Sequence, residues 1–150
     1  MNFGSSFGIS ASALTAQRLR MDVISSNIAN AETTRASVVD GKAVPYRRKL
    51  VVLETEKNNS FSNILNSKMG SENGSEGVKV QSIIEDSSPL KPVYNPSHPD
   101  ADVNGYVYMP NVDLTKEMVD MLSASRSYEA NVTMLNASKA MVSKALEIGQ

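Results

Sequence analysis

The chain has 150 residues and a mass of 16.2 kDa, which is the length of one domain. Its 15 lysines and arginines nearly balance its 16 aspartates and glutamates, so the basic excess typical of nucleic-acid-binding proteins is missing. The chain has no cysteine and one histidine, His98, which excludes disulfides, thiolate metal sites and a zinc site built on several histidines. The longest aliphatic run, 50–53, is too short to span a membrane. No signal peptide is expected, because the first basic residue is Arg18 and no cationic N-terminal region precedes an apolar stretch.

Proline and glycine divide the chain into three zones. Residues 5–31 contain no proline and a single glycine, residues 32–111 hold all six prolines, and residues 112–148 contain neither. Two flanking zones almost free of the helix-breaking residues proline and glycine, around a middle zone rich in them, predict an α+β fold. In this fold, long N- and C-terminal helices pair as a coiled-coil-like layer, and the middle is a small β-rich, loop-rich subdomain. The predicted boundaries are 1–34, 35–111 and 112–150.

The first zone has a seven-residue apolar repeat. Phe7, Leu14, Met21 and Ile28 are spaced seven apart, and the charged residues of 18–22 mark the solvent side. A repeat of this length favours an amphipathic helix that packs against another helix.

The middle zone contains three candidate strands. Residues 47–54 and 78–84 are rich in β-branched and aliphatic side chains, and residues 105–109 form a third short candidate. Residues 56–77 are rich in Asn, Ser and Gly, which predicts a mobile loop with one helical turn near 61–65. Residues 87–99 carry four prolines and are expected to be extended or turning.

The last zone predicts a long helix, capped at its start by Asp113 or Thr115. One series of positions alternates in steps of four and three, and eight of its ten members are apolar: Leu114, Met118, Met121, Ser125, Tyr128, Val132, Leu135, Lys139, Val142 and Leu146. Sustained over four heptads, this series predicts a coiled-coil seam.

A second apolar stripe runs beside that seam. It consists of Ala130, Met134, Ala137, Met141, Ala145 and Ile148. One interpretation is the ordinary core of a helical hairpin. Apolarity on two sides and an aromatic content of only 5% favour burial between subunits, since one partner helix covers a single face.

Signals of catalysis are weak. The sequence contains neither the Walker nor the Gly-x-Gly-x-x-Gly phosphate-binding loop, and it has no Gly-x-Ser-x-Gly motif. An enzyme is therefore disfavoured, and no cofactor is expected. Residues 98–102 offer ligands for a weak divalent ion, but a solvated turn is the simpler interpretation. The basic residues 47–49 could contact phosphates or a membrane surface; a solvated strand end or half of an inter-subunit salt bridge is the favoured interpretation.

Four stretches resemble a known family. They are 25–33 (SSNIANAET), 11–20 (ASALTAQRLR), 86–99, which ends in LKPVYNPSHP, and 105–131, which begins with GYVYMPN. The first resembles the signature of the bacterial flagellar rod and hook axial proteins. Together, the four stretches resemble the C-type proximal rod proteins of that family, and only 54–77 carries no likeness.

The resemblance implies a structural subunit of the flagellar rod, the hollow drive shaft between motor and hook. It implies export through the flagellar type III apparatus without signal cleavage, and location in the basal body within the periplasmic space. Implied partners are further copies, other proximal and distal rod subunits and the adaptor at the MS-ring junction, without nucleic acid and without a membrane span. Asn27 and Asn30 are expected to close the first helix and orient the chain that leaves it.

The apolar pattern and the resemblance together predict an assembly interface. Its members are Leu14, Met21, Ile24, Asn27, Ile28, Asn30, Met118, Met121, Arg126, Tyr128, Asn131, Val132, Met134, Leu135, Met141, Val142 and Leu146. Two alternatives stay open: another axial protein of the rod or its junctions, and a coiled-coil adaptor unrelated to flagella.

Overall fold

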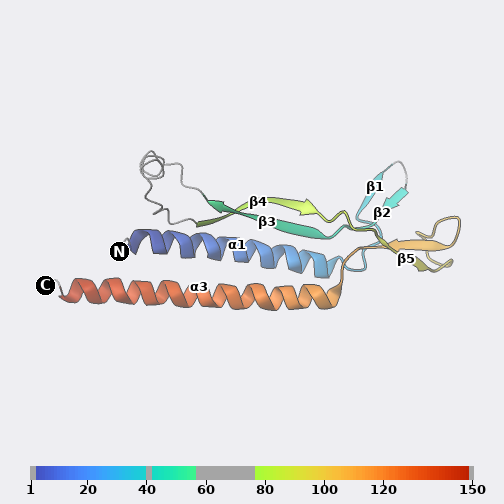
Figure 1. Ribbon diagram of the computed structural model, residues 1–150. Helices are drawn as coiled ribbons and strands as arrows, with labels where there is room; N and C mark the ends of the chain where they lie inside the picture. The colour runs from blue at the N-terminus through green and yellow to red at the C-terminus, as the bar shows by residue number, and fades with distance from the viewer. Residues whose placement is uncertain (1–2, 40–41, 57–76, 149–150) are drawn as a thin grey trace. The chain divides into compact units, whose positions relative to one another are not determined.

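A computed structural model of the chain describes residues 3–39, 42–56 and 77–148. Two long helices, α1 (Phe3–Ala29) and α3 (Leu114–Ile148), pack side by side, and the segment that joins them is rich in β-strands (Figure 1). The predicted α+β fold with paired terminal helices is therefore confirmed. Within the described ranges, neither helix contains an apolar stretch long enough to cross a bilayer.

The strands form three two-stranded sheets in the described part of the chain, with the orders β1-β2, β3-β4 and β5-β6. The strands are β1 (Ser37–Val39), β2 (Lys42–Val44), β3 (Lys49–Glu56), β4 (Gly77–Glu85), β5 (Lys91–Tyr94) and β6 (Tyr106–Met109). The three predicted strands correspond to β3, β4 and β6, while β1, β2 and β5 were not predicted. The predicted loop and helical turn within 56–77 fall almost wholly on residues outside the described ranges.

The chain divides into two compact units, which are described separately. Unit 1 consists of Met1–Leu19, Val52–Ser82 and Ala124–Gln150, and unit 2 consists of Arg20–Val51 and Ile83–Ser123. Each unit therefore contains part of both helices and part of the β3-β4 pair.

In unit 1, Ser12 joins α1 to the beginning of β4. Its hydroxyl donates to the Ile9 carbonyl at 2.8 Å and accepts the Val78 N–H at 3.1 Å. Only glycine fits beside this contact, because a Cβ on Gly77 would lie 2.9 Å from the Ser12 oxygen. The buried side chains in the described part of this unit are small, Ala16 on α1 and Ala124 on α3, which allows close backbone approach.

In unit 2, side chains close both helix ends. The Asn30 carboxamide donates to the Ser26 carbonyl at 2.9 Å and accepts from the Thr33 hydroxyl at 3.2 Å, and α1 ends there. This is the helix-closing role that the resemblance implied for Asn30. At the start of α3, Asp113 rather than Thr115 is the cap: its carboxylate accepts the N–H of Thr115 at 3.0 Å.

The predicted seam on α3 is wrong at several positions. Leu114, Met118, Lys139 and Leu146 are exposed. The buried and half-buried edge instead contains Glu117, Met121, Ala124, Tyr128, Asn131, Leu135, Ser138 and Val142. It keeps the spacing of four and three but differs by one residue at alternate positions. The prediction ranked positions by apolarity, whereas Glu117 is buried because polar partners satisfy it.

The β5-β6 hairpin of unit 2 depends on a glycine. The two strands are antiparallel, with Tyr94 opposite Tyr106 and their rings edge to face at 5.4 Å. In the connecting loop, Gly105 has a φ of 78°, and an added Cβ would lie 3.0 Å from the Tyr94 ring. This position therefore combines a left-handed backbone with a close approach.

Two glycine-to-alanine changes should act in opposite directions. Gly105→Ala is expected to lower the free energy of unfolding by about 1–2 kcal/mol, because a Cβ disfavours the left-handed backbone. Gly8→Ala is expected to raise it by about 0.5–1 kcal/mol, because this helical glycine has no atom within 4 Å of an added Cβ. Urea titration followed by circular dichroism measures both; equal shifts in one direction would contradict the assignment.

Candidate functional site

The most completely bonded side chain in unit 2 is Asn27, near the end of α1, which is 1% exposed. Its amide nitrogen donates to the Lys49 carbonyl at 2.9 Å and to Oε2 of Glu117 at 3.0 Å. Its oxygen accepts the Lys49 N–H at 2.9 Å and the Tyr46 hydroxyl at 3.0 Å. Both donors and both acceptor positions of the carboxamide are used, so Asn27 pairs with the start of β3 as a neighbouring strand would.

Glu117 of α3 faces Asn27 and is fully buried, with 0% exposure. The Nε and Nη2 atoms of Arg48 both lie 2.6 Å from its Oε1, while Asn27 holds its Oε2. Each carboxylate oxygen therefore has a donor. A charge so far from water is tolerated only with such partners, since an unpaired buried carboxylate is strongly destabilising.

Further polar groups surround Arg48. Nη2 lies 3.4 Å from Asp120 and Nη1 lies 3.7 Å from Asp86. The Arg48 backbone N–H donates to Oδ1 of Asn111 at 2.8 Å, and the Asn111 amide donates to the Asp86 and Ser88 carbonyls at 3.3 Å. Hydrogen bonds from the Ser88 hydroxyl and N–H, with the nearby Arg48, lower the pKa of Asp86.

We call Asn27, Tyr46, Arg48, Asn111 and Glu117 the polar lock. These residues join the end of α1, the segment before β3, the segment after β6 and the first turn of α3. The carboxamides and the buried ion pair fix the relative positions of these segments. The arrangement contains no activated nucleophile, and its acidic and basic side chains form ion pairs with each other, which suits a structural role.

The lock corrects the interpretation of residues 47–49. They were expected to form a solvated strand end or half of an inter-subunit salt bridge. Arg48 instead forms ion pairs inside the chain, and the Lys49 ammonium lies 5.7 Å from the centre of the Tyr46 ring. The sequence shows three cations followed by Glu54 and Glu56, and nothing in it indicates that Arg48 pairs with an acid 69 residues away.

Residues 98–102, the candidate weak metal site, are bonded within unit 2. Asp100 accepts hydrogen bonds from Arg35 and from the Thr34 hydroxyl, and these contacts lower its pKa. Their contribution to stability is thus present above the ordinary aspartate pKa and is lost as the pH falls. His98 accepts the Asp100 N–H at 3.1 Å. Among the described residues, no three acidic or histidine side chains are grouped to hold a metal ion.

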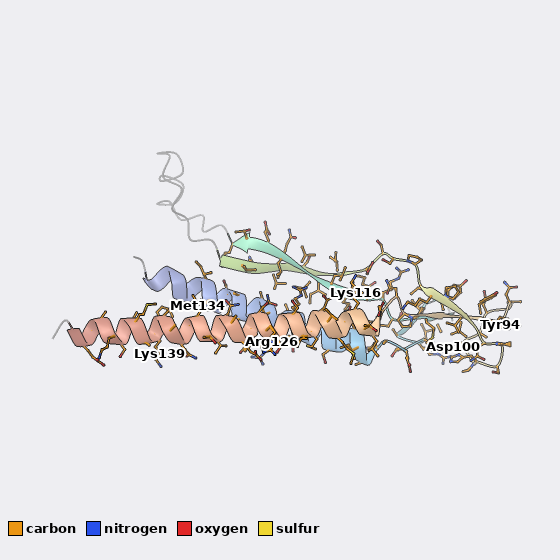
Figure 2. All side chains as sticks on the ribbon, turned by 60° about the horizontal axis from the view of Figure 1, so that its bottom comes forward. Tyr94, Asp100, Lys116, Arg126, Met134 and Lys139 are labelled. Atoms are coloured by element: carbon orange, nitrogen blue, oxygen red, sulfur yellow. The ribbon has the colours of Figure 1, made fainter. Side chains whose placement is uncertain are left out.

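The predicted interface residues fall into three groups. Ile24 and Asn27 are buried inside unit 2. Met118, Arg126, Met134, Met141 and Leu146 are exposed on α3, where Figure 2 labels Arg126 and Met134. The remaining ten are half-buried: Leu14, Met21, Ile28, Asn30, Met121, Tyr128, Asn131, Val132, Leu135 and Val142.

Arg48, Glu117, Tyr46 and Asn111 were not predicted as site residues. One signal for Glu117 was available, since it continues the spacing of four and three through Met121 and Ala124. A lone acid on an apolar edge indicates a buried, paired charge. No comparable signal exists for Tyr46 or Asn111, whose roles depend on segments that meet only in the fold.

Comparisons with known proteins agree with this structural role. Residues 7–36 match the family described as "Flagella basal body rod protein", and residues 103–148 match "Flagellar basal body rod FlgEFG protein C-terminal". Both matches include part of the lock, Asn27 in the first and Asn111 and Glu117 in the second.

Relatives that match over nearly their whole length narrow the assignment to one type of rod protein. They favour it over the two alternatives left open by the sequence, another axial protein and a coiled-coil adaptor unrelated to flagella. Flagellar basal-body rod protein FlgC of Bacillus subtilis (strain 168) is 62% identical over 146 residues, which cover 97% of each chain. The FlgC of Borreliella burgdorferi is 48% identical over 160 residues, covering 100% of this chain and 99% of the relative. The FlgC of Salmonella typhimurium is 46% identical over 144 residues, covering 96% of each. The chain therefore belongs to the FlgC family of flagellar basal-body rod proteins.

Proposed function

We propose that this chain is a structural, non-catalytic subunit of the proximal rod of the bacterial flagellar basal body. Its terminal helices, within 1–34 and 112–150, polymerise as the inner layer of the hollow drive shaft that transmits torque from motor to hook. The middle subdomain, 35–111, forms the outer part. The observation that carries the assembly mechanism is the uncovered apolar stripe on α3.

That stripe lies in unit 1. Met134 is 62% exposed and Met141 is 56% exposed, and Ala130, Ala137 and Ala145 between and beside them are exposed as well. Methionine side chains adapt to irregular partners, and alanines allow close helix approach. An apolar strip several turns long is typical of a protein interface. Neighbouring subunits that cover it would remove this surface from water.

The interface is assigned to the exposed and half-buried members of the predicted set. Ile24 and Asn27, which are buried in unit 2, contribute by holding the subunit in the form that its neighbours contact. Contacts between unlike surfaces propagate as a helical tube when the rotation from one subunit to the next does not close into a ring.

The same proposal covers transport and partners. The subunit passes through the flagellar type III export apparatus without a cleaved signal peptide and assembles in the periplasmic space. There it contacts further copies, other proximal and distal rod subunits and the adaptor at the MS-ring junction. Membership of the FlgC family supports these assignments.

Charge substitution on the stripe tests the proposal. Met134→Asp and Met141→Asp are expected to abolish motility and hook assembly while export of the subunit continues, because an interface would bury the new carboxylate without a partner. Hook counts by electron microscopy and secreted subunit by immunoblot measure the two effects.

The matched controls are Asn136→Asp and Ser143→Asp, which place the same charge on exposed positions of α3 outside the stripe. These variants are expected to swim normally. Normal swimming of the two methionine variants would show that the stripe is not an interface.

A further inference from the structure

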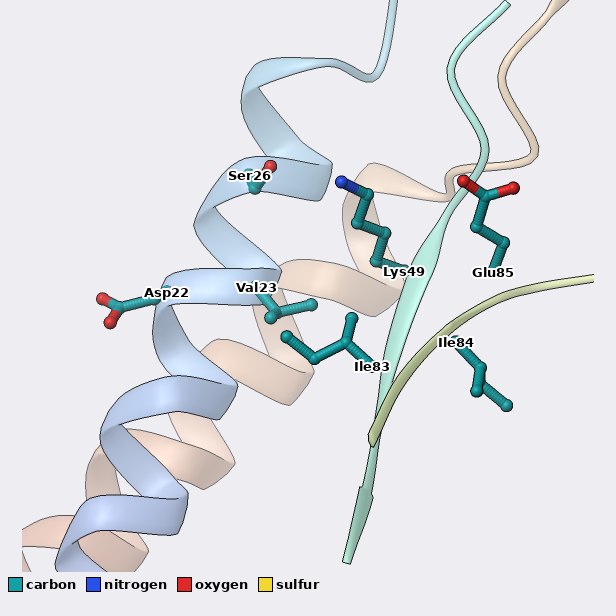
Figure 3. Close-up of a pocket in the computed structure, with 7 residues that line it drawn as sticks. All are labelled: Asp22, Val23, Ser26, Lys49, Ile83, Ile84 and Glu85. Atoms are coloured by element: carbon teal, nitrogen blue, oxygen red, sulfur yellow. The ribbon is translucent and has the colours of Figure 1, made fainter. Parts of the chain in front are cut away.

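Unit 2 contains a groove of about 490 Å³ between the C-terminal part of α1 and the strands β3 and β4 (Figure 3). It is lined by Asp22, Val23, Ser26, Lys49, Ile83, Ile84 and Glu85. The Val23 and Ile83 side chains point toward each other across it, and Ile83 is half exposed. We call it the α1-β4 groove; its interior is apolar and large enough for several side chains of a partner.

The edges of this groove carry negative charge. Asp22 and Glu85 stand on opposite sides of it and are both exposed. Neither takes part in an ion pair among the described residues, whose ion pairs involve other acids. The one cation of the groove, Lys49, has its ammonium near the Tyr46 ring. The groove therefore carries a net charge of −1 and can accept a cation from outside.

A surface of complementary chemistry lies on the first turns of α3, also in unit 2. Met118, Val119 and Leu122 are 60–63% exposed, and their spacing of three and four places them on one face. Lys116 precedes Val119 by three residues, so it flanks this face, and it forms no ion pair among the described residues. We call these four residues the α3 face.

We propose that the α1-β4 groove of one chain receives the α3 face of a second copy, with the Lys116 ammonium directed at Asp22 and Glu85. The apolar side chains fill the groove, and the single positive charge meets the net negative charge of its edges. Because the two surfaces are unlike, each pair of chains leaves one free groove and one free α3 face. The contact therefore repeats along a filament when the rotation between copies does not close into a ring. The inference rests on the proposed rod function and names the surfaces that carry it.

Cysteine cross-linking tests the contact in assembled basal bodies. The chain has no cysteine of its own, so introduced pairs report without background. Cells that make both Ile83→Cys and Leu122→Cys chains are expected to yield a disulfide-linked species of twice the chain mass after mild oxidation. Ile84→Cys replaces Ile83→Cys if the latter fails to assemble. The control pair, Thr15→Cys with Leu122→Cys, should give none, because Thr15 is exposed outside the groove.

Charge reversal provides an independent measurement. Glu85→Lys and Lys116→Glu, each alone, place like charges together and are expected to lower the number of hooks per cell about tenfold. The two changes in one chain should restore most of the hooks, because the pair is re-formed with its signs exchanged.

The outcomes separate this inference from the proposed function. Variant chains that enter basal bodies and support swimming without the cross-link would overturn the groove contact and leave the rod role intact. A cross-linked species of another mass would overturn the second copy as occupant. Basal bodies that lack the unmodified chain would overturn the proposed function itself.

Discussion

Replacing Arg48 by methionine is expected to lower the free energy of unfolding by about 3–5 kcal/mol. The change removes the guanidinium that lies 2.6 Å from Glu117 and leaves a fully buried carboxylate with Asn27 as its remaining partner. Domains of this size are stable by about 5–15 kcal/mol, so this loss removes a large fraction of the stability. Urea titration followed by circular dichroism measures it.

A double variant separates the charge from the shape. Arg48→Met with Glu117→Met removes both charges and keeps a similar volume, so stability should return to within about 1 kcal/mol of the original. The residual loss consists of the Asn27 hydrogen bond to Glu117 and the outer ion pairs of Arg48 with Asp86 and Asp120. The control is Arg126→Met, which breaks an exposed pair with Glu129 at 3.1 Å and should cost at most about 1 kcal/mol. A double variant as unstable as Arg48→Met would contradict the buried-charge explanation.

The polar lock gives the fold a single arrangement. Apolar contacts between helices are non-directional, so they tolerate a shift of one helix along the other. The lock does not, because a shift would break hydrogen bonds that no water replaces. A subunit that repeats along a filament needs every copy to have the same form, and the lock supplies this at the point where both helices meet the strands.

The helices were predictable because the signals for them are local. The absence of proline and glycine in 5–31 and 112–148, except Gly8, is enough to indicate two long helices, and β-branched runs were enough for β3 and β4. Strand β5 was missed because it contains Pro92, which argues against a strand except at an edge, and a two-stranded sheet consists of edges.

The buried edge of α3 could not be predicted from apolarity. Met118 is more apolar than Glu117, yet Met118 is exposed and Glu117 is buried. Burial of a charge depends on donors supplied by other segments, here Arg48 and Asn27. The spacing of four and three marks Glu117 as a member of this edge, but the donors that allow its burial meet it only in the fold.

A second variant, Asn27→Asp, should be strongly destabilised at neutral pH, by about 3–5 kcal/mol. The amide nitrogen at this position lies 3.0 Å from Oε2 of Glu117 and 2.9 Å from the Lys49 carbonyl, and the variant places a carboxylate oxygen there. Two buried carboxylates at this distance cannot both be charged, so one proton must be bound for the fold to persist. The change replaces one atom of the side chain and leaves its volume almost unaltered.

The loss should depend on pH in a defined direction. The pKa of the new carboxyl is raised in the folded chain above the ordinary value of about 3.9 in the unfolded chain. Its protonated form is therefore favoured by folding, and stability is present at low pH and is lost as the pH rises through the folded-state pKa. Unfolding titrations of the variant and the unmodified chain at about pH 5 and about pH 8 should show the smaller difference at the lower pH. Asn30→Asp is the control: its side chain contacts the Ser26 carbonyl and Thr33 but no carboxylate, so its loss should change little between the two pH values. A difference for Asn27→Asp that is independent of pH would show that Glu117 does not share its site with position 27.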